Sequence, residues 1–405
     1  MRPVGFLAAA LLLYGGLSVP APAEPGWIEG GIAVGLLLAA GWPQIWAVVS
    51  GRLMGDRAAS PVERIGTLVL WCLALLGLAR GGLAGWNGND IVRDLASLGF
   101  LFLPVFLGRT LRQAGEPGLR ILGLALAGAG VLFSLRWWQA TGLPRLTTDP
   151  TLWVEGRDYL LNSLAAPFAT IALLVSADDL AMRALSPGGR FLWRSAAVAA
   201  GGLIGVALGI AGHRGALGAV GVGLLAGIVA QTPRPLGRLA VWGGVLGGVL
   251  IAGLWFPEEL FALLEPVIRK TRLVGLNGRE QELMTVLDAV TSSGIMALLG
   301  TGWGGLLANP AVDGWRVSFV HNLPAYMLLK GGVVGLLLLV VYAGAFFPAL
   351  CRLLRERPAL GAAILPTLLV GIVLHTSFKY LCFGALLTLL AAAGETRQPA
   401  YKHKK

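Results

Sequence analysis

The stretch from Ser195 to Gln231, SAAVAAGGLIGVALGIAGHRGALGAVGVGLLAGIVAQ, decides the fold class. Within its 37 residues only His213 and Arg214 can ionise. As a single helix it would be roughly 55 Å long, although a bilayer core measures about 30 Å. The chain therefore turns near Gly212, and the stretch predicts two membrane-spanning helices with an arginine at their junction.

The composition of the whole chain agrees with a membrane location. Of 405 residues, 56% are hydrophobic and 13% are charged, whereas soluble domains carry roughly 25% charged residues. These values exclude soluble, disordered, coiled-coil and disulfide-scaffold classes. The chain has 32 basic and 21 acidic residues, a net charge of +11. In a membrane protein this excess indicates topology, and we expect no nucleic-acid partner.

Hydropathy predicts an all-α, polytopic bundle of about twelve transmembrane helices. An apolar first span followed by Ala21-Pro22-Ala23 leaves a cleaved signal peptide as an alternative. If both ends face the cytoplasm, every inner segment from Arg52 onward holds at least two cations, which favours an N-in and C-in orientation. The predicted spans are 4–20, 28–49, 64–79, 94–108, 119–135, 159–177, 195–212, 215–231, 239–256, 323–349, 359–377 and 380–394.

One long segment interrupts this series and divides the chain into three parts. Residues 1–256 hold nine spans, 257–322 form an outer loop, and 323–405 hold three spans and a basic tail. Apolar residues at helical spacing predict two amphipathic helices in the loop, from Pro257 and from Arg279 to Met296, lying at the membrane surface. A loop of this length in a compact protein is usually functional.

Three ionisable groups near the predicted outer face are the main site candidates. Arg214 follows His213 at the helix junction, and Arg279 begins the second loop helix. His321 precedes Asn322, a suitable N-cap for the next span, so its imidazole should lie at a positive helix end and stay neutral. Each has a structural alternative: an interfacial arginine, a solvated basic face and a structural histidine.

Taken together, these groups suit a membrane-resident anion bearing phosphate. Guanidinium groups bind phosphate oxygens bidentately, and helix N-termini favour anions. The four histidines show no ligand spacing with carboxylates, and no nucleotide-binding fingerprint occurs. We therefore expect no metal and no cofactor.

The order of these segments resembles the O-antigen ligase and O-antigen polymerase superfamily. The resemblance covers roughly residues 195–345 and includes the long loop after Trp255. It rests on these motifs: His-Arg-Gly-Ala-Leu at 213–217, Gly-Arg at 278–279, Gly-Thr-Gly-Trp-Gly at 300–304, His-Asn-Leu at 321–323 and Lys-Gly-Gly-Val-Val-Gly-Leu at 330–336. Each motif is weak alone, and their order and spacing give the likeness its specificity.

The resemblance implies a class-C-like (GT-C) glycosyltransferase of the bacterial inner membrane that works at the periplasmic face. It implies an undecaprenyl-diphosphate-linked glycan as donor and, in the ligase branch, lipid A–core oligosaccharide as acceptor. Arg214 and Arg279 would bind the donor diphosphate, and His321 would be the catalytic or acceptor-orienting group. The family commonly has Ser-Arg where this chain has His213-Arg214, so the role of His213 stays open.

Three further arginines toward the predicted outer face are secondary candidates for phosphate binding, together with His213 and Asn322. They are Arg80, Arg136 and Arg157, of which Arg136, followed by two tryptophans, also fits an interfacial anchor. Alternative functions remain: a polymerase or protein O-oligosaccharyltransferase of the same superfamily, or a lipid-linked glycan transporter. Transporters usually bind substrate near the bilayer midplane and have matching halves, which this sequence does not show.

Overall fold

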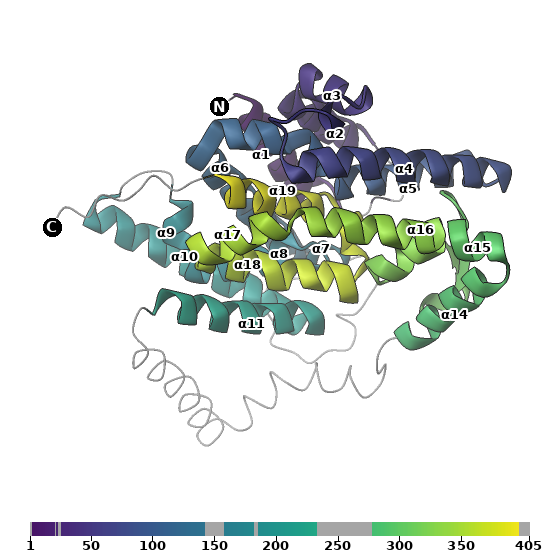
Figure 1. Cartoon of the computed structure of the whole chain (residues 1–405). Helices are drawn as coiled ribbons and strands as arrows, with labels where there is room; N and C mark the ends of the chain where they lie inside the picture. The colour runs from purple at the N-terminus through teal and green to yellow at the C-terminus, as the bar shows by residue number, and fades with distance from the viewer. Residues whose placement is uncertain are drawn as a thin grey trace.

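The structure is a computed structural model, and it describes residues 2–20, 22, 26–141, 158–181, 185–232 and 278–396. These residues are mostly helical, and the helices form one bundle (Figure 1). Five helical segments are long and apolar enough to cross a membrane, or six if the bent pair α2 and α3 counts as one span. The expectation of an all-α membrane bundle is thus supported in its coarse form.

The residues before the long loop form the helices α1 to α11. Several are short, because breaks at glycines or polar residues divide longer apolar stretches. The elements are α1 (Arg2–Leu17), α2 (Trp27–Ala40), α3 (Trp42–Val49), η1 (Arg52–Met54), α4 (Pro61–Leu83), α5 (Gly88–Leu101), α6 (Leu103–Thr141), α7 (Asp158–Leu161), α8 (Ala165–Val175), α9 (Ala177–Leu180), α10 (Pro187–Ile210) and α11 (Arg214–Gln231).

Residues from 278 onward add further helices and one small antiparallel hairpin, in which Leu307 pairs with Val317. Sequence analysis did not predict this hairpin inside the outer loop. The elements are α14 (Arg279–Thr291), α15 (Gly294–Leu299), β1 (Leu307–Asn309), η3 (Pro310–Val312), β2 (Trp315–Val317), α16 (Leu323–Ala345), α17 (Phe347–Glu356), α18 (Pro358–Leu369), η4 (Val370–Leu374), η5 (Thr376–Lys379) and α19 (Leu381–Glu395).

The predicted spans correspond to these helices only in part. The span 28–49 bends by 87° at Gly41, between α2 and α3. The span 94–108 crosses the junction of α5 and α6, and α6 is itself broken at Gly115, where φ is +61°. The predicted span 239–256 and the first loop helix lie outside the described residues, so the number of twelve spans stays a prediction.

The glycine motifs at 300–304 and 330–336 pack against each other. At Gly332, α16 has non-helical angles (φ +60°), which frees the carbonyls of the preceding turn. The Leu329 carbonyl accepts from the Thr301 N–H at 2.8 Å, and the Lys330 carbonyl accepts from the Gly302 N–H at 3.0 Å. A Cβ on Gly302 would lie 2.3 Å from the α4 backbone. The turn 300–305 is therefore wedged between α4 and the broken α16.

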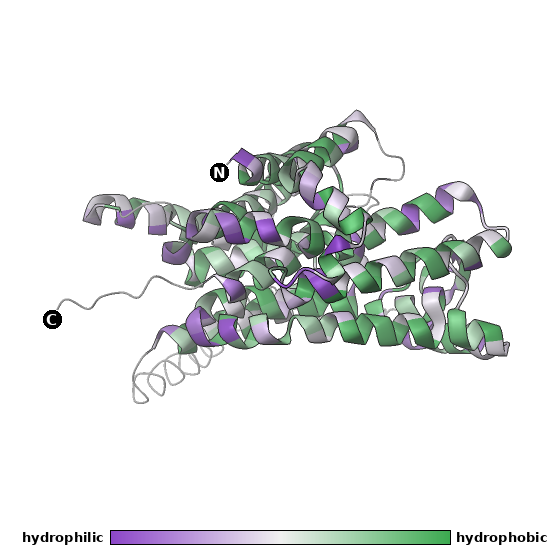
Figure 2. Ribbon diagram, turned by 45° about the horizontal axis from the view of Figure 1, so that its top comes forward, coloured by the Kyte–Doolittle hydropathy of each residue, from purple (hydrophilic) through white to green (hydrophobic). Residues whose placement is uncertain are grey.

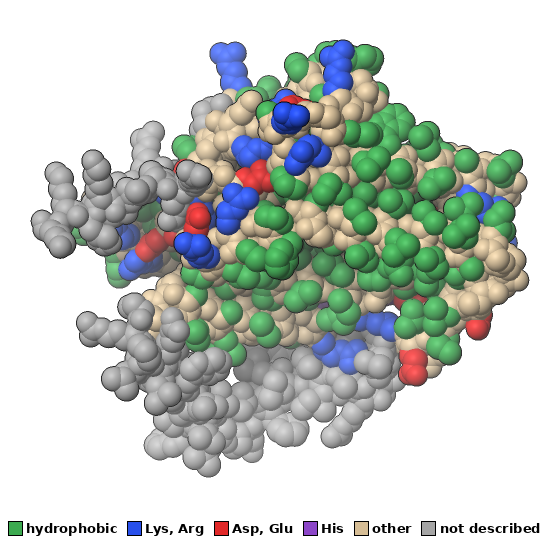
Figure 3. All heavy atoms as spheres, viewed as in Figure 1, with side chains coloured by type: hydrophobic (Ala, Val, Ile, Leu, Met, Phe, Trp, Pro, Cys, Tyr) green, Lys and Arg blue, Asp and Glu red, His purple; other side chains and the backbone are tan. Residues whose placement is uncertain are grey.

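Charged side chains gather at the two ends of the bundle. Hydrophobic residues dominate between them (Figure 2), and a wide apolar surface separates the charges on the face seen in Figure 3. At the end carrying α17, Arg112 pairs with Glu63 at 2.5 Å and with Glu395 at 2.9 Å, and Arg357 pairs with Glu116 at 2.6 Å. Arginines expected on the inner side thus also join helices. The helices α14 and α15 lie at the opposite end (Figure 1), and α14 begins with Arg279.

Candidate anion-binding site

Arg214 is the first residue of α11, as the hairpin argument from the sequence requires. Gly212 adopts a left-handed conformation (φ +63°) that ends α10, and His213 is the N-cap residue of α11. The first turn of α11 contains no acidic side chain. A cation at a helix N-terminus is electrostatically unfavourable because that end already carries partial positive charge. Such a placement gains stability when an anion binds there.

Arg279 repeats this arrangement at the start of α14. Gly278 precedes it with φ +66°, and a Cβ there would lie 3.2 Å from Ala311 of η3. Burial lowers the pKa of the Arg279 guanidinium, Glu282 raises it, and the positive charge of Arg214 lowers it again, leaving it below the ordinary value. The buried Nε of Arg279 has no acceptor among the described residues. A half-buried donor beside a like charge suits an anionic ligand.

His321 lies directly before α16, whose N-cap is Asn322 as predicted; the Asn322 side chain accepts from the Ala325 N–H at 3.0 Å. Sequence analysis did not identify the partner of His321. His321 Nδ1 is 3.0 Å from Glu282 Oε1, and the His321 backbone N–H donates to Glu282 Oε2 at 3.0 Å. The Glu282 side chain is 2% exposed and that of His321 is 22% exposed.

Glu282 is held as a carboxylate by these contacts. Burial alone would raise its pKa, but the hydrogen bonds and charge of His321, with a hydrogen bond from Asn309, lower it below the ordinary value. In the neutral tautomer that points its Nδ1 proton at this carboxylate, the lone pair of Nε2 is an acceptor. The imidazole is thereby oriented and able to receive a proton from a bound group.

Electrostatic interactions link five side chains from four separate segments, here named the arginine–histidine cluster: His213, Arg214, Arg279, His321 and His375. Arg214 acts electrostatically on Arg279, and His213, His321 and Arg279 act on His375. His375 lies in the extended link between η4 and η5, and a Cβ on Gly215 of α11 would lie 3.2 Å from its neighbour Leu374. The fold thus brings the predicted main candidates together.

Among the secondary candidates, His213 belongs to the cluster, whereas Arg80, Arg136 and Asn322 are engaged elsewhere. Arg80 of α4 donates through Nε to the Gly300 carbonyl at 3.1 Å, so it caps α15. Arg136 of α6 donates to the carbonyls of Gly15 and Ser18 and so caps α1. Arg157 lies outside the described residues. Both placed arginines therefore already have structural partners, and Asn322 acts as the cap of α16.

Two residues of the site escaped sequence analysis for different reasons. Glu282 lies on the same buried face of α14 as Val286 and Val290. Extending the predicted apolar face of this helix by one turn would therefore have identified Glu282 as a buried carboxylate. His375 lies within a predicted span and carries no local signal. Its buried Nδ1 has no partner in the described part of the chain. Only the tertiary arrangement brings it to the cluster.

Two further findings concern metal binding at the site and the similarity of the chain to known proteins. Within the described ranges, no three His, Cys, Asp or Glu side chains are grouped so that they could hold a metal ion. No protein-family model matches the chain, and no curated protein is significantly similar to it.

Proposed function

We propose that this chain is a membrane glycosyltransferase of the O-antigen ligase type, with a GT-C-like fold. It would transfer a glycan from undecaprenyl diphosphate to lipid A–core oligosaccharide at the periplasmic face of the bacterial inner membrane. The observation that carries this proposal is the electrostatic interaction of Arg214 with Arg279, and of Arg279 and His321 with His375, which joins side chains from separate segments. The motif order seen in the sequence supplies the substrate classes.

The two arginines provide the binding half of the reaction. The positive charges of Arg214 and Arg279 repel each other. A diphosphate bound between the two guanidinium groups would offset this repulsion. Negative charge grows on the diphosphate as its bond to the sugar breaks. Fixed guanidinium groups in a half-buried site stabilise this charge more than water does. The proposed reaction therefore needs neither a metal nor a nucleotide.

His321 provides the proton-transfer half. An acceptor hydroxyl attacks the anomeric carbon on the side opposite the diphosphate, forming the new C–O bond and inverting the centre. The hydroxyl proton passes to Nε2 of His321, the bond to the diphosphate breaks, and undecaprenyl diphosphate leaves. Glu282 holds the Nδ1 proton and stabilises the imidazolium that forms. General-base assistance of this kind is typically worth about 10²–10⁴-fold.

The test is reconstitution in proteoliposomes with lipid-linked glycan and lipid A–core, scored for covalent product. We expect Arg214→Ala and His321→Ala to abolish transfer while the protein still inserts. Arg352→Ala is the matched control, because Arg352 is an exposed arginine of α17 at the other end of the bundle. Normal transfer by either site variant contradicts the proposal. Movement of the labelled lipid-linked glycan without any covalent product would favour a transporter.

A further inference from the structure

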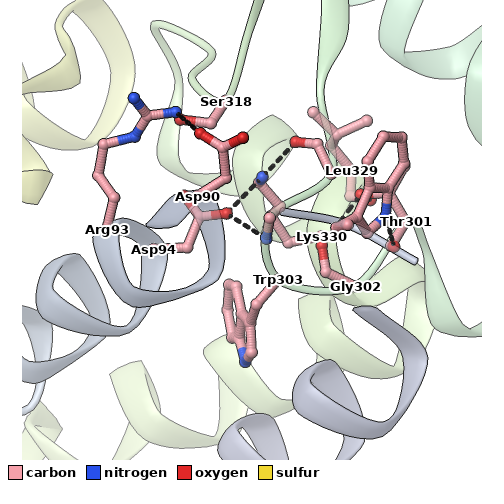
Figure 4. Close-up of polar contacts among 12 residues, drawn as sticks. Asp90, Arg93, Asp94, Thr301, Gly302, Trp303, Ser318, Leu329 and Lys330 are labelled. Atoms are coloured by element: carbon pink, nitrogen blue, oxygen red, sulfur yellow. Dashed lines mark hydrogen bonds and ion pairs between the residues drawn. The ribbon is translucent and has the colours of Figure 1, made fainter. Parts of the chain in front are cut away.

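A second polar group surrounds the buried carboxylate of Asp94 and is here named the Asp94 network. It consists of Asp94, Gly304, Tyr326, Lys330 and Lys379. Asp94 Oδ2 accepts from Lys330 Nζ at 2.6 Å and from the Gly304 N–H at 2.9 Å (Figure 4). Asp94 Oδ1 accepts from the Tyr326 hydroxyl at 3.0 Å. The side chains of Asp94 and Lys330 are both 0% exposed. This carboxylate joins α5, the wedged turn and α16.

Lys379 connects this network to the segment that carries His321. Its Nζ lies 3.8 Å from Asp94 Oδ1 and 4.2 Å from the centre of the Tyr326 ring. The same Nζ donates to the Ser318 carbonyl at 3.1 Å. Ser318 follows β2 and precedes His321 by three residues. The series of contacts from Asp94 through Lys379 to Ser318 therefore ends three residues before the proposed base, His321.

We propose that Lys379 is a positioning residue for His321, which it holds in place through the Ser318 carbonyl while Asp94 anchors the lysine. The inference rests on the proposed function only in naming His321 as the base. Glu282 fixes the imidazole itself, and Asn309 binds the Phe319 carbonyl at 3.2 Å. Lys379 adds a contact between this segment and η5, next to Asp94 of α5.

The cost of this lysine supports a specific role. A buried ammonium loses hydration worth several kcal/mol, and a well-packed apolar residue is often as stable or more so. Asp94 is already paired with Lys330 at a shorter distance, so the second lysine does little to neutralise that carboxylate. Lys379 does supply a long, directed donor that reaches a backbone carbonyl from η5. An apolar side chain of equal length would fill the space and leave that carbonyl without this bond.

The test measures the position of His321 without using transfer activity. In the purified full-length protein, diethyl pyrocarbonate modifies accessible, unprotonated imidazoles, and peptide mass spectrometry reports the rate for each histidine. We expect Lys379→Met to raise the modification rate of His321 severalfold. Tyr326→Phe is the matched control, because it removes one hydrogen bond from Asp94 and leaves the Lys379–Ser318 contact in place.

Kinetics then separate positioning from general structural damage. Displacing the base should lower kcat about 10- to 100-fold while KM for the lipid-linked donor stays unchanged, because the arginines bind it. Lys379→Gln, which keeps a donor, should recover part of kcat. Unchanged His321 modification in folded Lys379→Met overturns the inference even if no transfer is ever found. Should that variant fail to fold, Asp94→Asn weakens the same anchor and must raise His321 modification.

Discussion

The Asp94 network and the arginine–histidine cluster lie at the same end of the bundle, but their electrostatics differ. In the Asp94 network, the buried carboxylate accepts three hydrogen bonds at 2.6–3.0 Å and is paired with a buried ammonium. In the cluster, two arginines of like charge interact, and the buried Nε of Arg279 has no acceptor in the described part of the chain. The oxygens of Asp94 are satisfied by the protein, whereas the Nε of Arg279 would gain an acceptor when an anion binds.

This difference separates structural from functional polarity in a protein with few charges. Buried polar groups whose partners all come from the protein fix helix positions, as Asp94 and Lys330 do for α5 and α16. Groups left with unmet hydrogen bonds and like-charge repulsion are retained at a cost in stability, which is typical of binding sites. The comparison can be tested by removing one charge from each group.

The largest effect is expected from Lys330→Met. It leaves the Asp94 carboxylate buried without its closest counter-charge, and breaking a buried pair in this way costs about 3–5 kcal/mol. Arg279→Gln should instead change the free energy of unfolding by less than about 0.5 kcal/mol, because it also relieves repulsion from Arg214. Thermal unfolding of both variants in the same detergent measures the contrast.

The double variant Asp94→Leu/Lys330→Met provides the control for this prediction. Replacing both partners removes the isolated charge, so it should be less destabilised than Lys330→Met alone. If Arg279→Gln lost as much stability as Lys330→Met, the cluster would be a structural element like the Asp94 network, and the distinction between them would be wrong.

Glu282→Gln is expected to act mainly on catalysis. The amide keeps the shape of the side chain but carries no negative charge. The Nδ1–H of His321 therefore loses the carboxylate that orients the ring and stabilises the imidazolium. Loss of such a supporting group typically costs about 10–100-fold in activity. Transfer assays in proteoliposomes measure kcat, and Glu280→Gln, an exposed neighbour on the same helix, is the control. Equal activity of the two variants would remove Glu282 from the mechanism.

Sequence patterns predicted local features well and tertiary combinations poorly. The junction at Gly212, the cap at Asn322 and the start of α14 at Arg279 all follow from turn and capping chemistry that acts within a few residues. The partnership of Glu282 with His321, and that of Asp94 with Lys330, join residues far apart in the chain. No spacing rule connects such residues, because their contact depends on how α5, α14 and α16 are arranged.

Helix breaks inside apolar segments were also beyond the hydropathy argument. Mean hydropathy does not distinguish a straight helix from one interrupted at Gly332, because glycine fits both. The contacts of the 300–305 turn decide the conformation, since Thr301 and Gly302 supply the N–H groups that occupy the freed carbonyls. The motifs at 300–304 and 330–336 were recognised separately, and the structure explains them as two halves of one packing interaction.

A ligand should stabilise the cluster without affecting the Asp94 network. Inorganic pyrophosphate carries the charge pattern proposed for the donor and can be added without its lipid. At a tenfold excess over Kd, binding to the folded state alone adds about 1.4 kcal/mol, seen as a rise in Tm. Arg279→Gln should lose this rise, and Arg352→Ala should keep it. An equal rise in both variants would mean that pyrophosphate binds elsewhere.

The last effect concerns Lys379, which belongs to the Asp94 network and lies beside the positive charge of Lys330. Burial lowers the pKa of Lys379 to about 7, and Lys330 and Arg93 lower it while Asp94 raises it. From pH 7 to 9 the unfolded chain therefore binds more protons at this residue than the folded chain does, so its contribution to stability rises with pH. The Tm of the natural protein should rise relative to that of Lys379→Met across this range. If Tm changed with pH in the same way in both proteins, Lys379 would stay charged at pH 9. The Asp94 network would then hold an excess positive charge, and its electrostatics would resemble those of the arginine–histidine cluster more than its hydrogen bonds indicate.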